Sequence, residues 1–109
     1  MPRHEFGIMP APPGPGTRYD EYEPERYGCI PVEDDDLLPR LPRLDGLACF
    51  WHTPDRPGRG LAYCGVTLIP PESLVEFADA LEGEPKLSAL AALLDRARRE
   101  GRYVIHFGI

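Results

Sequence analysis

The sequence lacks the short motifs that identify many enzymes. It contains no GxSxG, no phosphate-binding loop, no GxGxxG and no HExxH, so serine hydrolases, nucleotide-binding enzymes and zinc proteases have no motif to support them. It also has no apolar run long enough to span a bilayer, and its first residues contain no apolar signal segment. We therefore expect a soluble, cytoplasmic protein whose function does not depend on a familiar motif.

Positive charge is scarce, and the cysteines show no pairing pattern. Against 18 acidic residues there are 12 basic ones, which gives a formal net charge of -6 and disfavours nucleic-acid binding, because phosphates require a basic surface. The three cysteines, Cys29, Cys49 and Cys64, are an odd number without a CxxC spacing. This pattern favours reduced thiols, with a Cys49–Cys64 disulfide as the alternative.

The clearest β signal lies between Gly46 and Ile69. Two apolar runs, Leu47 to Thr53 and Leu61 to Ile69, flank a polar connection from Pro54 to Gly60, and this arrangement predicts a hairpin with a compact loop. Alternation along the second run gives it one more uniformly apolar face, which we expect to point toward the core. That face consists of Ala62, Cys64, Val66 and Leu68.

Helices are predicted mainly in the C-terminal third. The first follows Pro70 and ends at Gly83, and the second runs from about Lys86 to Glu100 and is stopped by Gly101. Their apolar residues recur at helical spacing, so we expect one buried stripe over the sheet. The stripe consists of Leu74, Phe77, Leu81, Leu87, Leu90 and Leu94.

Shorter elements complete the expected fold. Tyr27 to Val32 predicts an edge strand, because Pro31 cannot donate to a ladder; the acidic run after it favours a brief helix, and Arg102 to Phe107 predicts a last strand. We predict an α+β fold with a small, mainly antiparallel four-stranded sheet backed by two C-terminal helices, a ferredoxin-like split βαβ order being one variant. Residues 1–26 are expected to form an extended proline-rich, acidic arm, and residues 27–109 a single domain.

Acidic residues gather between Asp20 and Asp36, where eight of the 18 in the chain are found. Concentrated charge accelerates encounter with a basic partner and makes binding sensitive to salt. We therefore expect a binding protein of the inhibitor, immunity or accessory type, whose partner is another protein or a second copy of this chain and not nucleic acid or a membrane. The candidate partner-binding residues are Asp20, Glu21, Glu23, Glu25, Asp34, Asp35 and Asp36.

The alternative function is a small-molecule site or a small enzyme around the predicted hairpin. Its wall would be an aromatic ring, its anion clamp an arginine of the connection, and its reactive group a cysteine or histidine. Histidines and cysteines on apolar strands are more often packing residues, so the sequence leaves enzymatic activity open. The ligand-binding candidates are Trp51, His52, Arg56, Arg59, Tyr63, Cys64 and His106.

Neither a metal site nor a cofactor is expected. Cys49 and His52 are close in sequence, but residues three apart on a strand point to opposite faces, whereas metal ligands must converge. The acidic run from Glu33 to Asp36 lacks the glycine and the distal glutamate of a calcium-binding loop.

Overall fold

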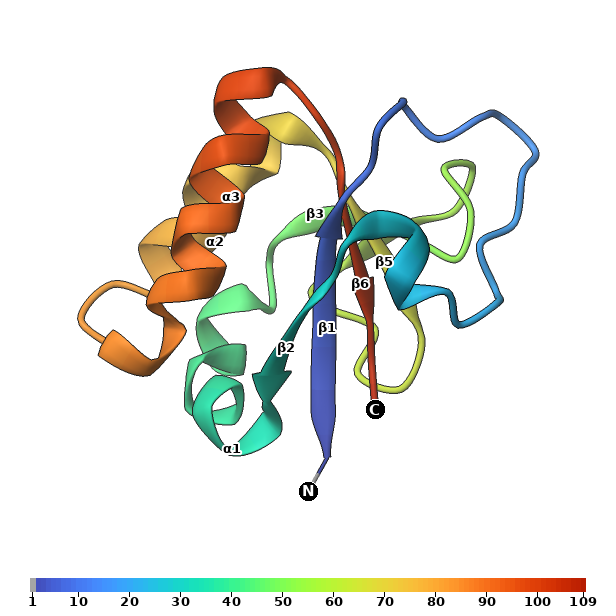
Figure 1. Cartoon of the computed structure of the whole chain (residues 1–109). Coiled ribbons are helices and arrows are strands. Elements are labelled where there is room, and N and C mark those ends of the chain that lie inside the picture. The colour runs from blue at the N-terminus through green and yellow to red at the C-terminus, as the bar shows by residue number, and fades with distance from the viewer. Residues whose placement is uncertain (1) are drawn as a thin grey trace.

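The computed structural model describes residues 2–109, which form an α+β fold around one antiparallel sheet (Figure 1). Within this range the sheet has six strands, in the spatial order β2-β1-β6-β5-β3-β4, and every pair of neighbours is antiparallel. The strands are β1 (Arg3–Ile8), β2 (Ile30–Glu33), β3 (Ala48–Trp51), β4 (Pro57–Arg59), β5 (Val66–Ile69) and β6 (Val104–Phe107).

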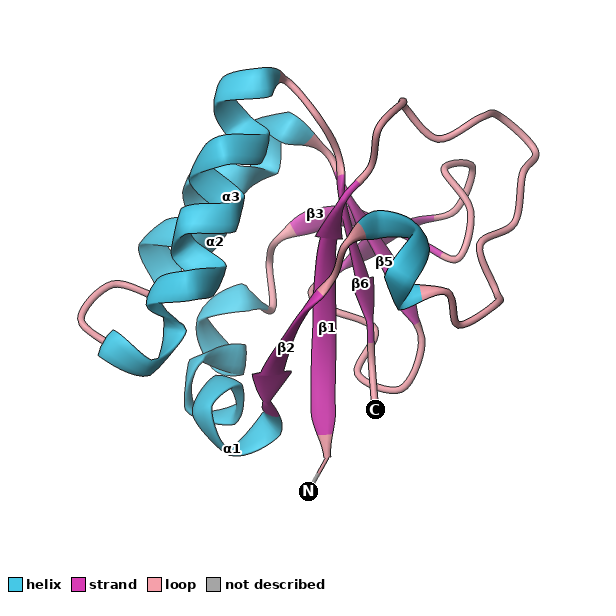
Figure 2. Ribbon diagram, viewed as in Figure 1, coloured by secondary structure: helices cyan, strands magenta, loops and turns pink. Residues whose placement is uncertain are grey.

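Helices cover one face of this sheet, as Figure 2 shows. They are α1 (Asp34–Leu37), α2 (Leu74–Ala80) and α3 (Ser88–Glu100). α3 ends where predicted, because Gly101 adopts the left-handed conformation, with a φ of 66°, that glycine accepts more readily than other residues. The predicted helix after Pro70 is also present, but it begins as a 3-10 turn, Pro71–Ser73, before α2.

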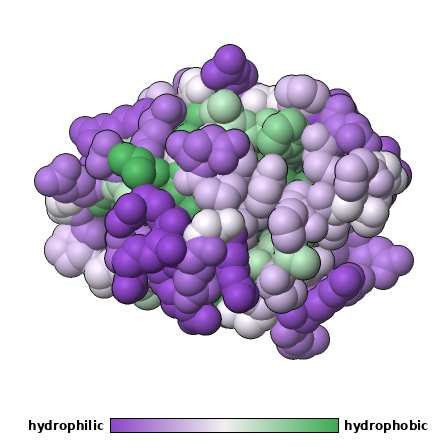
Figure 3. All heavy atoms as spheres, turned by 90° about the horizontal axis from the view of Figure 1, so that it is seen from above, coloured by the Kyte–Doolittle hydropathy of each residue, from purple (hydrophilic) through white to green (hydrophobic). Residues whose placement is uncertain are grey.

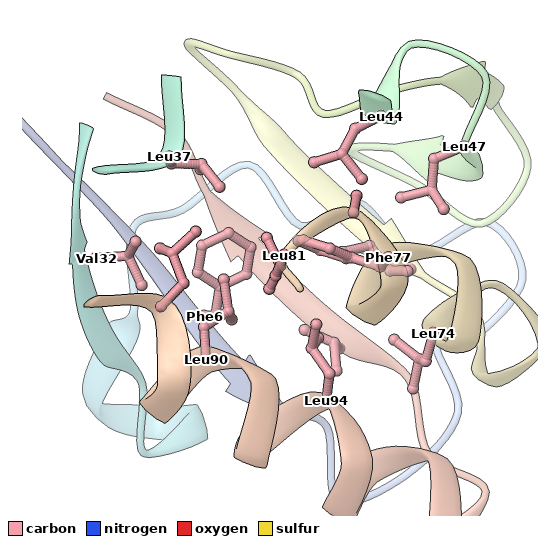
Figure 4. Packing of buried hydrophobic residues seen from close by; sticks show 14 of the residues in the cluster. Phe6, Val32, Leu37, Leu44, Leu47, Leu74, Phe77, Leu81, Leu90 and Leu94 are labelled. Carbon is pink, nitrogen blue, oxygen red and sulfur yellow. The ribbon is translucent and has the colours of Figure 1, made fainter. Parts of the chain in front are cut away.

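The main hydrophobic core lies between the helices and the sheet (Figure 4). All six residues of the predicted helical stripe are at most 3% exposed and belong to this core. Phe77 is fully buried and meets Phe6 of β1 edge to face, with ring centroids 5.8 Å apart. The stripe is buried as predicted, because neither helix can leave it in water.

The opposite face of the sheet is covered by residues 9–29, which loop over it on the side away from the helices (Figure 1). Met9 and Tyr27 pack there against residues of β5 and β6 in a second, smaller cluster. Backbone hydrogen bonds attach this segment at two points, from Met9 N to Tyr103 O at 2.9 Å and from Tyr19 N to His52 O at 2.6 Å. The sheet is therefore buried on both faces.

The prediction of a four-stranded sheet backed by two C-terminal helices is wrong. Over residues 2–109 the sheet has six strands and no parallel pair, which also excludes the split βαβ variant, and there are three α-helices. β1 was missed because the prolines after Ile8 led us to predict an extended arm. The residues His4, Phe6 and Ile8 nevertheless alternate as a half-buried strand requires. β4 was missed because it lies within the predicted connection of the hairpin, where Pro57 and Gly58 indicated a turn.

The face assigned to β5 is also wrong. Val66 and Leu68 belong to the smaller cluster, on the side covered by residues 9–29, whereas Ile69 contributes to the main core below the helices. Cys64 lies before the strand and is exposed. Both faces of β5 are apolar enough to be buried, so alternation alone could not decide which one meets the helices.

Among residues 2–109, no helix combines the length and the apolar character that a membrane crossing would require. Seen from above, the molecule is mainly hydrophilic, with hydrophobic residues in small separate areas (Figure 3).

Replacing Phe77 by Ala should cost about 3–5 kcal/mol of folding free energy, because it removes a fully buried aromatic ring from the main core. Urea unfolding measures this loss. The matched control is Val75→Ala on the same helix, where the side chain is 52% exposed and the change should stay within about 0.5 kcal/mol. Equal unfolding midpoints for the two variants would contradict this packing.

Candidate functional site

Strand register brings three polar side chains together below the helices. His106 of β6 pairs with Phe6 of β1 on one side and with Thr67 of β5 on the other. Residues in register across a sheet point to the same face, and His4 shares that face because it lies two residues from Phe6. His4, His106 and Thr67 are each 0% exposed.

These side chains form a continuous hydrogen-bonded chain. Thr67 Oγ1 lies 3.1 Å from His106 Nδ1, and His106 Nε2 lies 2.9 Å from His4 Nδ1. His4 Nε2 in turn lies 2.8 Å from Asp34 Oδ1, and the hydroxyl of Tyr63 donates to Asp34 Oδ2 at 2.7 Å. We call these five residues the buried polar chain.

One placement of protons satisfies the whole chain with both imidazoles neutral. The Thr67 hydroxyl accepts from the Ala62 N–H at 2.8 Å and donates to His106 Nδ1. His106 then donates from Nε2 to His4, and His4 donates from Nε2 to the Asp34 carboxylate. Every ring nitrogen has a partner, so the chain meets the requirement that buried polar groups be hydrogen-bonded.

The surroundings shift the pKa values of three of these groups. Burial, assisted by the neighbouring His4, lowers the pKa of His106 to about 3. Hydrogen bonds from His4 and Tyr63 lower the pKa of Asp34. The hydrogen bond to Asp34, followed by burial, raises the pKa of Tyr63 to about 12. At neutral pH, Asp34 is therefore ionised and Tyr63 is protonated.

A pocket of about 160 Å³ opens on the other face of the sheet. Val66 and Phe107 contribute apolar surface, and the backbones of Gly65 and Gly108 border it. Asp20, Tyr22, His52 and Cys64 supply its polar side chains. We call this space the Cys64 pocket.

His52, which lines this pocket, has an unusual backbone conformation. Its φ is 65°, a left-handed value that only this non-glycine residue adopts among residues 2–109. The backbone is held there from both sides, since His52 N donates to Val66 O at 3.0 Å and His52 O accepts from Tyr19 N. Such conformations cost about 1–3 kcal/mol and persist only where surrounding contacts impose them.

The two nitrogens of His52 face different neighbours. Nδ1 lies 2.8 Å from Asp20 Oδ1, at an angle that does not make a regular hydrogen bond. Nε2 lies over the backbone of Gly65, so close that a Cβ at Gly65 would be 2.6 Å from it. A side chain at position 65 would displace this imidazole, and Nε2 is brought beside the residue that follows Cys64.

The three cysteines are free thiols in different surroundings. Cys64 is exposed, whereas Cys49 is buried and Cys29 is partly buried. Burial raises the pKa of Cys29 to about 12 and that of Cys49 to about 11. Because Cys49 and Cys64 are both free, the alternative of a Cys49–Cys64 disulfide is wrong. Cys64 is the thiol most open to a ligand.

The seven candidate ligand-binding residues lie in three separate places. His52 and Cys64 line the Cys64 pocket, whereas His106 and Tyr63 belong to the buried polar chain. Trp51, Arg56 and Arg59 lie at the β3–β4 edge.

At that edge, the indole of Trp51 packs on Gly58 and donates to Gly60 O at 3.0 Å. The Arg56 guanidinium lies 6.0 Å from the Trp51 ring, and Arg59 donates to Gly46 O at 3.1 Å. None of these three residues lines the Cys64 pocket.

Sequence reasoning missed His4 and Thr67, and it treated Asp20 and Asp34 only as surface charge. For His4, the available signal was its alternation with Phe6 along a strand. Nothing local identifies Thr67, because its role depends on the β5–β6 register. Among residues 2–109, no three His, Cys, Asp or Glu side chains are placed to hold a metal ion.

Acidification should destabilise the protein through His106. Its folded pKa of about 3 lies below its ordinary 6.5, so the unfolded chain takes up the proton first, and stability present at neutral pH is lost as the pH falls below about 6.5. One such group contributes up to about 1.4 kcal/mol per pH unit. Asp34 has the same sign, but its lowered pKa acts only below about its ordinary 3.8.

Urea unfolding at about pH 7.5 and about pH 5.5 measures this dependence. His106→Gln removes the titrating group, and its stability should change less between the two pH values than that of the wild type. Equal changes in the two proteins would contradict the assignment of His106 as a buried neutral imidazole.

Comparison with known proteins adds no functional assignment to this geometry. No protein-family model matches the chain, and neither a curated protein nor a solved structure gives a significant match.

Proposed function

We propose that the protein is a small thiol-dependent enzyme acting on a small acyl compound, with Cys64 as nucleophile. The observation that carries this proposal is the position of His52. Its Nδ1 faces the Asp20 carboxylate, and its Nε2 faces the backbone beside the exposed Cys64. This is the order of groups in a nucleophile, base and carboxylate arrangement.

Each residue then has a defined role. Asp20 favours the tautomer with the proton on Nδ1, which leaves the Nε2 lone pair free to accept the Cys64 proton. Arg18 donates to Asp20 Oδ2 at 2.7 Å and lowers the pKa of this carboxyl, so Asp20 stays ionised and stabilises the imidazolium that forms.

The chemical step follows from these roles. Cys64 Sγ bonds to the acyl carbon while its proton passes to His52 Nε2; the bond from the acyl carbon to the leaving group then breaks, and the leaving group takes that proton. Water gives a proton to His52 and attacks the thioester; the C–S bond breaks, the carboxylic acid leaves, and the proton returns from His52 to Cys64.

The backbone of His52 supports a functional interpretation. A strained conformation that neighbouring contacts enforce is common at active sites, where geometry matters more than local stability. The loose alignment of Nδ1 with Asp20 is also compatible with catalysis, because such hydrogen bonds often tighten only when substrate is bound.

We also propose a cytoplasmic location. Its support is the state of the cysteines, since three free thiols suit a reducing compartment.

Alkylation of Cys64 tests the enzymatic proposal. At about pH 7 the wild type should react about tenfold faster than His52→Asn, because the base is lost, while Asn tolerates the left-handed backbone. Asp20→Asn should lie between the two. Peptide mapping by mass spectrometry separates Cys64 from Cys29 and Cys49, which should react only after unfolding. Equal rates for wild type and H52N would rule out His52 as the base.

A second candidate function is partner binding through acidic residues. Four of them, Glu21, Glu25, Glu33 and Asp35, are exposed and form no ion pair within residues 2–109. Asp34, in contrast, is buried in the polar chain and is not available to a partner. We propose that the partner is a protein with a basic surface.

Changing these four residues to Gln or Asn tests this second function. Capture of a partner from the native host should weaken for the variant, and the capture by wild type should decline between about 50 mM and about 500 mM salt. Arg96→Gln on exposed α3 is the control for a charge change elsewhere. Capture by the variant equal to that by wild type, with the same salt dependence, would contradict this function.

A further inference from the structure

The buried polar chain begins and ends at two consecutive residues just before Cys64. At one end Thr67 Oγ1 accepts from Ala62 N at 2.8 Å, and at the other the Tyr63 hydroxyl donates to Asp34 at 2.7 Å. The side chains between these ends come from β1, β5, β6 and α1. The hydrogen bonds therefore form a ring that closes at Ala62 and Tyr63, in the loop that carries Cys64.

The same loop is tied to residues 108 and 109 by backbone hydrogen bonds. Ile109 N donates to Tyr63 O at 3.0 Å, and Gly108 N donates to Gly65 O at 2.7 Å. Gly108 has no space for a side chain, because a Cβ there would overlap the Tyr63 carbonyl. Figure 1 shows this loop between β4 and β5, beside the C-terminus. These hydrogen bonds hold the backbone on both sides of Cys64.

The loop also joins the two faces of the sheet. Tyr63 reaches the helix side, where its ring meets His4 edge to face with centroids 5.4 Å apart. Cys64 and Gly65 line the pocket on the opposite side, where His52 Nε2 lies against Gly65. A shift of Tyr63 therefore changes the position of Cys64 relative to His52.

We infer that the buried polar chain is a positioning device for Cys64, with Tyr63 and Thr67 as the positioning residues. The catalytic role of Cys64 rests on the proposed function above, whereas its placement by the chain is a separate property. The ionised carboxylate of Asp34 holds the Tyr63 hydroxyl through a charge-assisted hydrogen bond, which is stronger than a neutral one. At the other end, the Thr67 hydroxyl accepts a neutral hydrogen bond directly from Ala62 N. The histidine pair links Thr67 to Asp34.

This arrangement explains why so many polar groups are buried in a small protein. Their alternative would be apolar packing, which often gives equal or greater stability than a buried polar network. A network with every member satisfied instead fixes one geometry, and here that geometry is the loop before the thiol. Displacement of a reacting group by about 1 Å can cost about a hundredfold in rate.

The test compares alkylation of Cys64 in Tyr63→Phe and Tyr103→Phe. Y63F keeps the aromatic ring but loses the hydrogen bond to Asp34, so Cys64 should react about tenfold more slowly at about pH 7. Y103F removes a phenol hydroxyl outside the buried polar chain and should react at the wild-type rate. Equal rates for Y63F and Y103F would overturn the inference.

A double-variant comparison separates positioning from a general loss of structure. If Tyr63 acts through the geometry of Cys64 and His52, then Y63F should slow alkylation in the wild type and have little further effect in H52N. If Y63F slowed alkylation of Cys64 as much in H52N as in the wild type, the coupling between Tyr63 and His52 would be overturned. Equal rates for wild type and H52N, with Y63F still slow, would overturn the proposed base and leave the positioning supported.

Labelling of Cys29 and Cys49 reports unfolding in the same experiment. If Y63F exposes these thiols, Thr67→Val replaces it as the test, because it releases the opposite end of the chain and keeps a similar side-chain volume. T67V should slow alkylation of Cys64 by a similar factor while Cys29 and Cys49 stay protected. A wild-type rate for T67V would overturn the inference.

Discussion

The hydrogen bond between His4 and His106 is the contact on which the rest of the structure depends. It joins side chains 102 residues apart in sequence, with 2.9 Å between His4 Nδ1 and His106 Nε2, on the neighbouring strands β1 and β6. A buried imidazole must have partners for both nitrogens, so this bond requires Thr67 on one side and Asp34 on the other. Those two residues in turn fix the positions of β5, of α1 and of the loop before Cys64.

Elements with a clear local signal were the ones that the sequence could predict. The apolar stripe from Leu74 to Leu94 repeats at helical spacing and is buried, and Gly101 ends α3 as its lack of a side chain suggests. β1 and β4 were missed because prolines and glycines in or beside them indicated turns. The number of strands therefore depended on long-range pairing, which outweighs local propensity.

The candidate site also depends on long-range pairing that local patterns do not predict. His52 and Cys64 were predicted as candidates, but the role of Asp20 depends on a segment that folds across the opposite face of the sheet. His106 was also a candidate, yet its neighbours His4 and Thr67 lie on β1 and β5, the two strands that flank β6. A change of one residue in either register would turn these side chains to the other face, and no local pattern sets it.

The central position of β6 bears on how the protein is made. β6 lies between β1 and β5, so the sheet remains in two separate parts until residues 104–107 have left the ribosome. Before then, β1 can pair only with β2, and β5 can pair only with β3. The two parts of the sheet can therefore join only once β6 has been made, and until then the chain exposes hydrophobic surface that favours aggregation.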